Sequence, residues 1–302
     1  MKFYHINAFS DTPDGGNPAG VAICEGGNFP EDTKMQRIAA DVGFSETAFI
    51  ANKRGKLNIR YFTPECEVDL CGHATIAAFR GLMEAGFAEP GEDYKVTTKA
   101  GEISVKLEHR FIAITMAPAR VVSTVKEEQS LKLVYQSLGL EYNPVRFMPA
   151  CGTYSNLNPM VVDVGLSFLM VPINGKESLN NIEANLPLIK EISKGLRCSG
   201  IYAFAFETKD IGTMAHTRGF YPLIGIPEEC ATGTAVSALS YYLNGFGLFP
   251  QGREAKFIQG EAMGRPSELT TFIKGKGMNM EIMVGGNAAV VESRDIRVGE
   301  IR

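Results

Sequence analysis

Two short stretches place a thiol beside glycine where an apolar run begins. The first, DLCGHATIAAF, contains Cys71, Gly72 and His73. The second, EECATGTAVSAL, contains Cys230 and Gly233. The first turn of a helix leaves backbone N–H groups unpaired, and its dipole favours negative charge. Each stretch is therefore predicted to bind a carboxylate and to lower the pKa of a thiol at the helix start.

If these two helix starts face each other, Cys71 and Cys230 lie on opposite sides of one anion site. That geometry suits proton removal from carbon next to a carboxylate, because one thiolate can accept a proton while the other thiol donates one. Glycine at positions 72 and 233 lets a ligand approach the backbone closely. The alternative is that both thiols are small buried hydrophobic groups and that His73 caps its helix or fills the core.

The other cysteine and histidine residues are interpreted as structural. The cysteines expected to be small buried side chains are Cys24, Cys66, Cys151 and Cys198. The segment CGTY, which begins at Cys151, resembles a motif of thiol racemases, but no apolar helix follows it, so we interpret it as a loop. The histidines without a motif context, expected to be structural or solvated, are His5, His109 and His216.

A carboxylate precedes a predicted apolar strand in GFSETAFI, where Glu46 lies between Ser45 and Thr47. A charged side chain in such a place is costly unless it faces solvent or a cavity. Taken alone, the stretch fits a glutamate at a strand edge in water. The stretch DGGNPAGV, which contains Asn17, is by itself only a turn that enters a strand.

The elements that must position these residues occur twice. In each half, a strand with Arg-x-Phe is followed by a proline, a cysteine and an Ala-rich apolar helix. The matched positions are Arg60, Phe62, Pro64 and Cys71 in the first half, and Arg218, Phe220, Pro222 and Cys230 in the second. The helices, predicted from Gly72 to about Glu84 and from near Ala231, are too apolar on all sides for surface helices.

The repeat predicts an α+β fold of two similar domains, each a curved β-sheet or barrel around a central apolar helix. The first domain is expected to span residues 1–122, with a C-terminal strand from about 289–302 as a candidate addition. The second is expected to span residues 123–288. Further helices are predicted at 31–43, near 131–139 and at about 182–196.

Composition narrows the classes of function. The 302 residues are 45% hydrophobic, but they contain no apolar run near the roughly 20 residues that a membrane helix needs. The net charge is −4 and no basic tract is present, which disfavours nucleic acid as a partner. We therefore expect neither a membrane nor a nucleic acid, but a small molecule.

The compartment and the cofactor follow from similar observations. The opening residues MKFYHINAF alternate like a strand and lack the features of a secretory signal, so a cytoplasmic location is expected. The six cysteines lack disulfide or zinc spacing, so no metal is expected. Without a nucleotide loop or P-loop, we predict no cofactor.

Taken together, six segments in order resemble the PhzF-like family, named for a phenazine-biosynthesis isomerase, within the wider diaminopimelate-epimerase fold. The segments are NAFSDTPDGGNPAGV, GFSETAFI, YFTPECEVDLCGHATIAA, RGFYPLIGIPEECATGTAVSAL, IQGEAMGRPSEL and MVGGNAAVV. Together they cover nearly the whole chain. The resemblance implies a homodimer and a cofactor-independent isomerase whose glutamate, at Glu46, carries a proton between two carbons of an unsaturated carboxylate.

The resemblance also implies roles for the other candidates. The family's CGH motif matches Cys71, Gly72 and His73, with the imidazole near the substrate. The candidates for substrate binding are Asn17 in the NPAG turn, Ser45, Gly72, and the TGS-like Thr232, Gly233 and Thr234, whose amides would help hold the substrate carboxylate.

One departure from the family keeps an alternative open. Where the usual pattern reads EDPATGS, the sequence reads EECATGT, so that Glu229 replaces the aspartate and Cys230 the proline. Paired with Cys71, the added thiol resembles proline racemase and diaminopimelate epimerase, in which two thiols exchange the α-proton. Glu229 and Cys230 thus join Glu46, His73 and Cys71 as catalytic candidates.

Three hypotheses remain. The PhzF-like isomerase ranks first because six segments support it, and a two-thiol amino-acid racemase or epimerase ranks second because one substitution supports it. The third is a catalytically silent small-molecule-binding protein on the same scaffold, since a fold does not fix a function. Replacement of Glu46, His73 or Cys71 would favour the third hypothesis, and the sequence keeps all three residues.

Overall fold

The chain divides into two compact units in a computed structural model. Unit 1 is Met1–Thr115 with Gly285–Arg302, and unit 2 is Met116–Val284. The structure describes residues 1–109, 111–147, 155–206, 212–250, 252–275, 277 and 280–295. The sequence placed the domain boundaries near 122 and 288, a few residues later than the boundaries of these units.

Unit 1 is a sheet with one helix inside it and one outside. Its strands are β1 (Lys2–Ala8), β2 (Asn17–Ile23), β3 (Thr47–Lys53), β4 (Lys56–Phe62), β5 (Glu67–Val68), β6 (Asp93–Thr98), β7 (Gly101–Glu108), β8 (Phe111–Thr115) and β20 (Ala288–Asp295). Its helices are the 3-10 turn η1 (Glu25–Gly27), α1 (Asp32–Val42) and α2 (Gly72–Glu84). The bounds of α2 confirm the predicted helix.

Unit 2 repeats this plan with additional helices. Its strands are β9 (Arg120–Thr124), β10 (Val145–Phe147), β11 (Ser155–Leu157), β12 (Met160–Asp163), β13 (Ser167–Pro172), β14 (Ile201–Phe206), β15 (Thr213–Tyr221), β16 (Ile226–Glu229), β17 (Glu254–Gln259), β18 (Ser267–Lys274) and β19 (Glu281–Gly286), whose last residues belong to unit 1. Its helices are α3 (Glu128–Ser137), α4 (Lys176–Asn180), α5 (Leu186–Leu196), η2 (Pro222–Ile224), α6 (Gly233–Gly245) and η3 (Glu261–Met263).

The order of strand pairing is the same in the two units. In unit 1, β2 runs parallel to β3, β3 is antiparallel to β4, and β4 is parallel to β6 across the α2 connection. In unit 2, β13 and β14, β14 and β15, and β15 and β17 pair in the same three ways, with α6 in the last connection. Strand β9 pairs antiparallel with β12, just as β20 pairs antiparallel with β1. Strand β9 therefore belongs to unit 2, and the boundary between the units comes before it.

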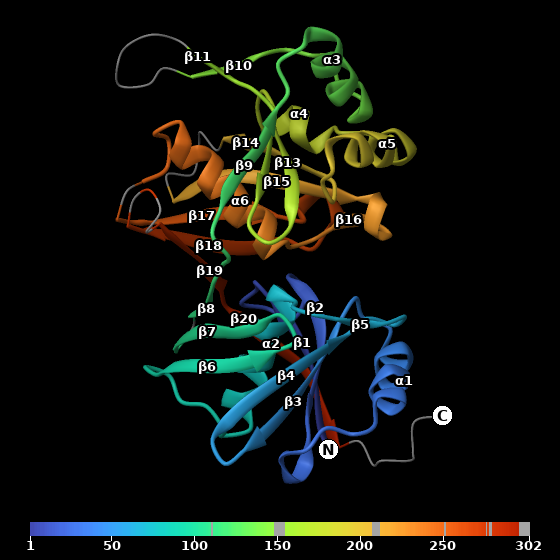
Figure 1. Ribbon diagram of the computed structural model, residues 1–302, viewed down its shortest axis with the longest axis vertical. Coiled ribbons are helices and arrows are strands. Elements are labelled where there is room, and N and C mark those ends of the chain that lie inside the picture. Colours follow the sequence, from blue (N-terminus) through green and yellow to red (C-terminus); the bar gives the residue numbers. More distant parts are fainter. Residues whose placement is uncertain are drawn as a thin grey trace. The chain divides into compact units, whose positions relative to one another are not determined.

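Helix α2 is buried on all sides, as its sequence predicts. Its side chains from His73 to Phe79 are buried, as are Gly81 and Leu82. A Cβ on Gly81 would lie 2.9 Å from the Val21 Cγ1 atom, so glycine lets the helix approach β2 closely. Figure 1 shows α2 among the strands of unit 1 and α1 on the outside of that unit. The predicted α+β class, with a sheet wrapped around an apolar helix in each unit, is confirmed.

The outer helices cover the other face of each sheet. In unit 1, α1 packs through Met35, Ile38 and Ala39 onto an apolar cluster that includes Phe49 and Phe62. In unit 2, α3 and α5 cover a larger apolar cluster in the same way. Within the described residues, no helix combines the length and the apolar character needed to cross a membrane.

An ion pair between arginine and glutamate recurs at the same place in both units. The Arg60 guanidinium donates to both oxygens of Glu67 at 2.7 and 2.9 Å, and Arg218 donates to both oxygens of Glu228 at 2.8 and 2.9 Å. Each guanidinium also lies over the ring of the phenylalanine two positions along the strand, at 5.2 Å from the Phe62 centroid and 5.0 Å from the Phe220 centroid. The matched arginines of the sequence repeat are thus equivalent in structure.

We expect Arg218→Ala to destabilise the protein more than Arg60→Ala. The Arg218 side chain is 10% exposed and donates to three backbone carbonyls near the end of α4, whereas the Arg60 side chain is 23% exposed. Loss of a partner from a buried pair costs about 3–5 kcal/mol, and from a partly exposed one about 1–2 kcal/mol. Urea unfolding measures both variants; equal losses would contradict the assigned difference.

Candidate functional site

Glu46 is positioned by the connection from α1 to β3. Helix α1 ends at Gly43, whose φ of 70° is a left-handed conformation that glycine adopts freely. The chain then turns, and the Glu46 carbonyl accepts the Gly20 N–H at 3.1 Å just before β3 begins. This backbone bond fixes Glu46 beside β2, and its side chain is 16% exposed.

Cys71 and His73 are positioned by the start of α2. Cys71 is the N-cap residue and His73 lies in the first turn. The Thr75 hydroxyl donates to the Cys71 carbonyl at 2.7 Å. Because this bond uses the only hydroxyl proton of Thr75, the Tyr61 hydroxyl must be the donor in its 2.7 Å bond to Thr75. Burial raises the pKa of Tyr61 well above its ordinary value, so this donor stays protonated.

The imidazole of His73 lies between a thiol and a carboxylate. Its Nδ1 atom is 3.4 Å from Cys71 Sγ, and its Nε2 atom is 3.3 Å from Glu46 Oε2. The Ser45 hydroxyl also lies 3.4 Å from Nε2. Unit 1 therefore brings together Ser45, Glu46, Cys71 and His73, which the sequence selected.

The partly buried carboxylate of Glu46 has few hydrogen bonds to replace those it would make with water. Its Oε2 atom is buried, and among the described residues no group meets the geometry of a hydrogen bond to it. Oε2 instead lies 3.3 Å from His73 Nε2, which is an ion-pair distance if the imidazole is protonated. A neutral imidazole has one N–H and one lone pair, so a proton on Nε2 lies on the side of Ser45 and Glu46 and leaves Nδ1 to accept from the thiol.

The three donor atoms of Glu46, Cys71 and His73 lie within 4.8 Å of one another, which raises the question of a metal ion. A metal ion binds one nitrogen of an imidazole, whereas the thiol and the carboxylate here face opposite nitrogens. The geometry therefore favours a row of polar contacts over a set of ligands around one ion.

The other candidates of unit 1 lie close in the fold. Asn17 is the first residue of β2, is buried, and lies three positions before Gly20, which bonds to Glu46. Gly72 is the first residue of α2, and a Cβ there would meet only the Ile114 Cδ1 atom, at an ordinary 3.5 Å. Among the described residues, no side chain caps α2, so its first amides stay available to a ligand.

In unit 2, the helix begins later than predicted. Its N-cap is Thr232 and its first residue is Gly233, so the expected start near Ala231 is wrong. Cys230 therefore lies two positions before the N-cap, whereas Cys71 is itself the N-cap. The reason is that Thr232 stays extended, with φ −130° and ψ 93°, and its N–H donates to Gln259 Oε1 at 3.0 Å.

A buried network holds the side chain of Glu229. The Thr232 hydroxyl donates to Glu229 Oε2 at 2.5 Å and accepts from the Tyr221 hydroxyl at 3.0 Å. Because the Thr232 N–H is already taken by Gln259, it does not offer the open amide that was expected of it. The amides of Gly233 and Thr234, in the first turn of α6, remain as candidates.

Gln259 is a residue that the sequence did not identify. Its amide donates to the Glu229 carbonyl at 2.8 Å, and its oxygen accepts from the Tyr202 hydroxyl at 2.9 Å. It is fully buried at the end of β17. The only signal was a polar residue at an inward position of an alternating strand, which the pattern does not distinguish from an edge residue.

The environment of Cys230 favours the protonated thiol over the thiolate. Burial raises its pKa to about 11, and the negative charge of Glu229 acts in the same direction, while Arg265 opposes both. The helix start two positions away does not offset these effects. Cys230 and Cys71, which are equivalent in the sequence repeat, are therefore in different chemical environments.

The remaining predictions on cysteine and histidine have mixed outcomes. Cys24 and Cys198 are buried as expected, but Cys66 is exposed because it closes a turn whose amides bond to Thr63. His216 is buried and bonds to Glu261, which also accepts from Lys176 at 3.0 Å. The CGTY segment that begins at Cys151 lies outside the described residues.

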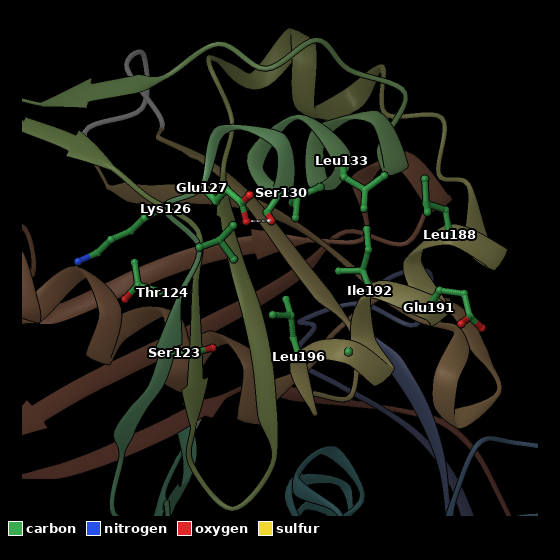
Figure 2. A pocket seen from close by; sticks show the side chains of 13 residues that line it. Ser123, Thr124, Lys126, Glu127, Ser130, Leu133, Leu188, Glu191, Ile192 and Leu196 are labelled. Carbon is green, nitrogen blue, oxygen red and sulfur yellow. Dashed lines mark hydrogen bonds between the residues drawn. The ribbon is translucent and has the colours of Figure 1, made fainter.

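A hollow in unit 2 lies away from the start of α6. It has a volume of about 590 Å³ and is lined by α3, α5 and the segment after β9. Figure 2 shows Leu133, Leu188, Ile192 and Leu196 around it, with the side chain of Lys126 to one side. It contains none of the predicted site residues. The expectation that the starts of α2 and α6 share one site concerns both units and stays a prediction.

Comparisons with known proteins place these residues in context. The family model described as phenazine biosynthesis-like protein matches residues 6–294. An uncharacterized isomerase of Clostridium acetobutylicum is 32% identical, with 96% of each chain covered.

Two solved structures extend the comparison. A phenazine biosynthesis protein of the PhzF family from Bacillus anthracis is 25% identical, covers 99% of both chains and superposes with a TM-score of 0.85. A probable proline racemase from Agrobacterium radiobacter is 13% identical, with 98% of this chain and 93% of that chain covered and a TM-score of 0.61, and shows a likeness of fold alone.

We expect Cys230 to react slowly with iodoacetamide through pH 9 and to become reactive only as the pH approaches about 11, because its thiol stays protonated. Glu229→Gln should lower that midpoint, since it removes a negative charge that opposes the thiolate. The raised pKa also adds to the free energy of unfolding. This contribution is fully present below pH 9.0, the ordinary pKa of the thiol, and is lost as the pH rises towards about 11. Peptide mass spectrometry measures the rate of alkylation at Cys230. Full reactivity at pH 8 would contradict the raised pKa of this thiol.

Proposed function

The chain belongs to the phenazine biosynthesis-like protein family, and from that membership we propose that it moves a proton at carbon next to, or conjugated with, a carboxylate of a small molecule. It is an isomerase, like its relatives, and we expect it to need no cofactor. The observation that carries the proposal is the buried oxygen of Glu46, which lies 3.3 Å from His73 Nε2 and has no hydrogen-bond donor among the described residues.

The proposed reaction begins with Glu46 as the base. Its carboxylate takes a proton from an acidic C–H, and the electron pair of that bond moves into the conjugated carboxylate of the substrate. The resulting Glu46 carboxylic acid returns the proton to a second carbon, so the substrate gains and loses one proton and the enzyme is unchanged. The buried Oε2 atom has no hydrogen-bond partner among the described residues, so its lone pairs are open to an acidic C–H of the substrate.

His73 has the role of keeping Glu46 ready for the reaction. Its Nε2 atom lies 3.3 Å from Glu46 Oε2, which restricts the position of the carboxylate, and the contact of the same nitrogen with the Ser45 hydroxyl limits the movement of the ring. The amides at the start of α2, and those of Gly233 and Thr234 at the start of α6, are proposed to bind carboxylate, because the first turn of a helix favours anions. Asn17 is proposed to contribute from the start of β2.

The two-thiol racemase is supported less well. It needs Cys230 to alternate between thiol and thiolate, yet burial raises the pKa of this thiol to about 11. Cys230 also lies outside the first turn of α6. A likeness of fold to a probable proline racemase does not outweigh these two observations, since that structure is only 13% identical. A silent binding protein would not need the contact between Glu46 and His73.

We predict that Glu46→Gln abolishes most of the turnover while the fold persists. The amide keeps the shape of the side chain but cannot accept a proton, so the rate should fall by about 10² or more. The assay presents a panel of unsaturated carboxylates and L-amino acids in D2O and follows proton migration by NMR. Glu102→Gln, on an exposed residue of the same unit, is the matched control.

Any substrate of the native chain that the Glu46→Gln variant turns over at the native rate would overturn the role of Glu46. If the native chain turns over no member of the panel but binds one of them, the silent binding protein becomes the better account.

Cys230→Ser separates the two reactions. If Glu46 carries the proton, this variant should keep the rate within about tenfold, because the thiol only packs. If the two thiols form the pair of bases, the rate should be nearly abolished, since a hydroxyl does not ionise as a thiol does. The matching observation is deuterium at the α-carbon of an amino acid with inversion of its configuration, which the isomerase does not produce.

A further inference from the structure

The thiol of Cys71 has a chemical setting that the proposed isomerase reaction does not use. Its Sγ atom lies 3.4 Å from His73 Nδ1, and the opposite nitrogen of that ring lies 3.3 Å from Glu46 Oε2. The order thiol, imidazole, carboxylate is the arrangement in which a base activates a nucleophile and a third group orients the base. We infer that Cys71 is an activated nucleophile and that it captures small electrophiles that carry a carboxylate.

The activation requires only a short movement of one proton. When the proton of Cys71 moves to His73 Nδ1, the positive charge of the ring lies between two anions. The ring is then 3.4 Å from the Cys71 sulfur through Nδ1 and 3.3 Å from Glu46 Oε2 through Nε2, and both negative charges stabilise it. The thiolate also lies at the N-cap of α2, a thirteen-residue helix whose dipole favours negative charge at this end.

The other cysteines provide internal controls. Cys24 and Cys230 are about as buried as Cys71, with exposed fractions of 7%, 5% and 9%. Burial raises the pKa of Cys24 and of Cys230 to about 11. Cys66 is exposed and lies 3.7 Å from the Thr63 hydroxyl. Cys71 differs from Cys24 and Cys66 in having a hydrogen-bond contact with an imidazole, and from Cys230 in lying at the N-cap of its helix.

The class of ligand follows from what surrounds the sulfur. The first amides of α2 lie beside it without a side-chain cap among the described residues, and the charged ring of His73 would add a cation. Both favour an anionic reagent. With an unsaturated carboxylate, the thiolate forms a C–S bond at the β-carbon, the electron pair of the double bond moves to the α-carbon, and that carbon takes the proton held by His73. The net change adds S–H across the double bond.

This inference goes beyond the proposed function, because it requires no turnover and is tested without the natural substrate. The probes are iodoacetate and iodoacetamide, with which the thiolate forms a C–S bond as the C–I bond breaks and iodide leaves. Native protein is treated at pH 6.5, where an ordinary thiol is only about 1% ionised. Mass spectrometry of the cysteine peptides gives the rate at each site.

We expect Cys71 to be modified at least about tenfold faster than Cys24 and Cys230, which have similar burial. The ratio of the iodoacetate rate to the iodoacetamide rate should be higher at Cys71 than at the exposed Cys66. His73→Gln should lower the rate at Cys71 about tenfold or more and leave that at Cys66 unchanged. Circular dichroism checks that the variant folds, and Glu46→Gln, which should also slow Cys71, is the second variant.

Equal rates at Cys71, Cys24 and Cys230 in the native chain would overturn the inference, and this result does not depend on any variant. A fast Cys71 whose rate does not change in His73→Gln would overturn the role of the imidazole. An equal preference for the two reagents at Cys71 and Cys66 would overturn the carboxylate class. A chain that isomerises a substrate and also shows equal rates would contradict only the activated thiol, so the two proposals fail separately.

Discussion

The imidazole of His73 has two nitrogens and must satisfy two different neighbours, and the rest of the unit 1 site depends on how it does so. Nε2 meets the Glu46 carboxylate and Nδ1 meets the Cys71 thiol. Because the ring is buried, water does not substitute for either partner at low cost. The backbone bond that holds Glu46 beside Gly20 and the hydroxyl chain that holds Cys71 both serve to keep these contacts in place.

The duplicated fold supplies the two helix starts, but the two units use them differently. At the start of α2, an acid–base chain ends on the N-cap thiol. At the start of α6, Gln259 and Thr232 hold the backbone and the Glu229 side chain in a buried hydrogen-bond network, and burial raises the pKa of the nearby Cys230 thiol to about 11. Unit 1 thus carries the groups that we propose to exchange protons, whereas the hydrogen bonds at the start of α6 hold their donors in fixed positions. This division favours a single glutamate as the proton carrier over a symmetric pair of thiols.

Much of the fold could be predicted from the sequence, because it depends on local pattern. The all-round apolarity of 72–84 fixes a buried helix, and the repeated Arg-x-Phe strands mark equivalent ion pairs in the two units. The exposed position of Cys66 and the late start of α6 depend on turn and cap bonds that no apolar pattern reports. Gln259 is remote in sequence from Thr232, so its bond to that amide is visible only in the folded chain. Family resemblance selected Glu46 and His73 separately, and their contact is visible only in the folded chain.

The position of the ring proton of His73 tests the central claim most directly. Nitrogen-15 NMR of protein labelled at histidine, with His73→Gln to assign the signals, reports which ring nitrogen is protonated. The account predicts a proton on Nε2, the nitrogen that faces the Glu46 carboxylate, at every pH at which that carboxylate is ionised. It also predicts that Glu46→Gln changes the Nε2 signal. A neutral ring with its proton on Nδ1 and a bare Nε2 beside the carboxylate would contradict the account.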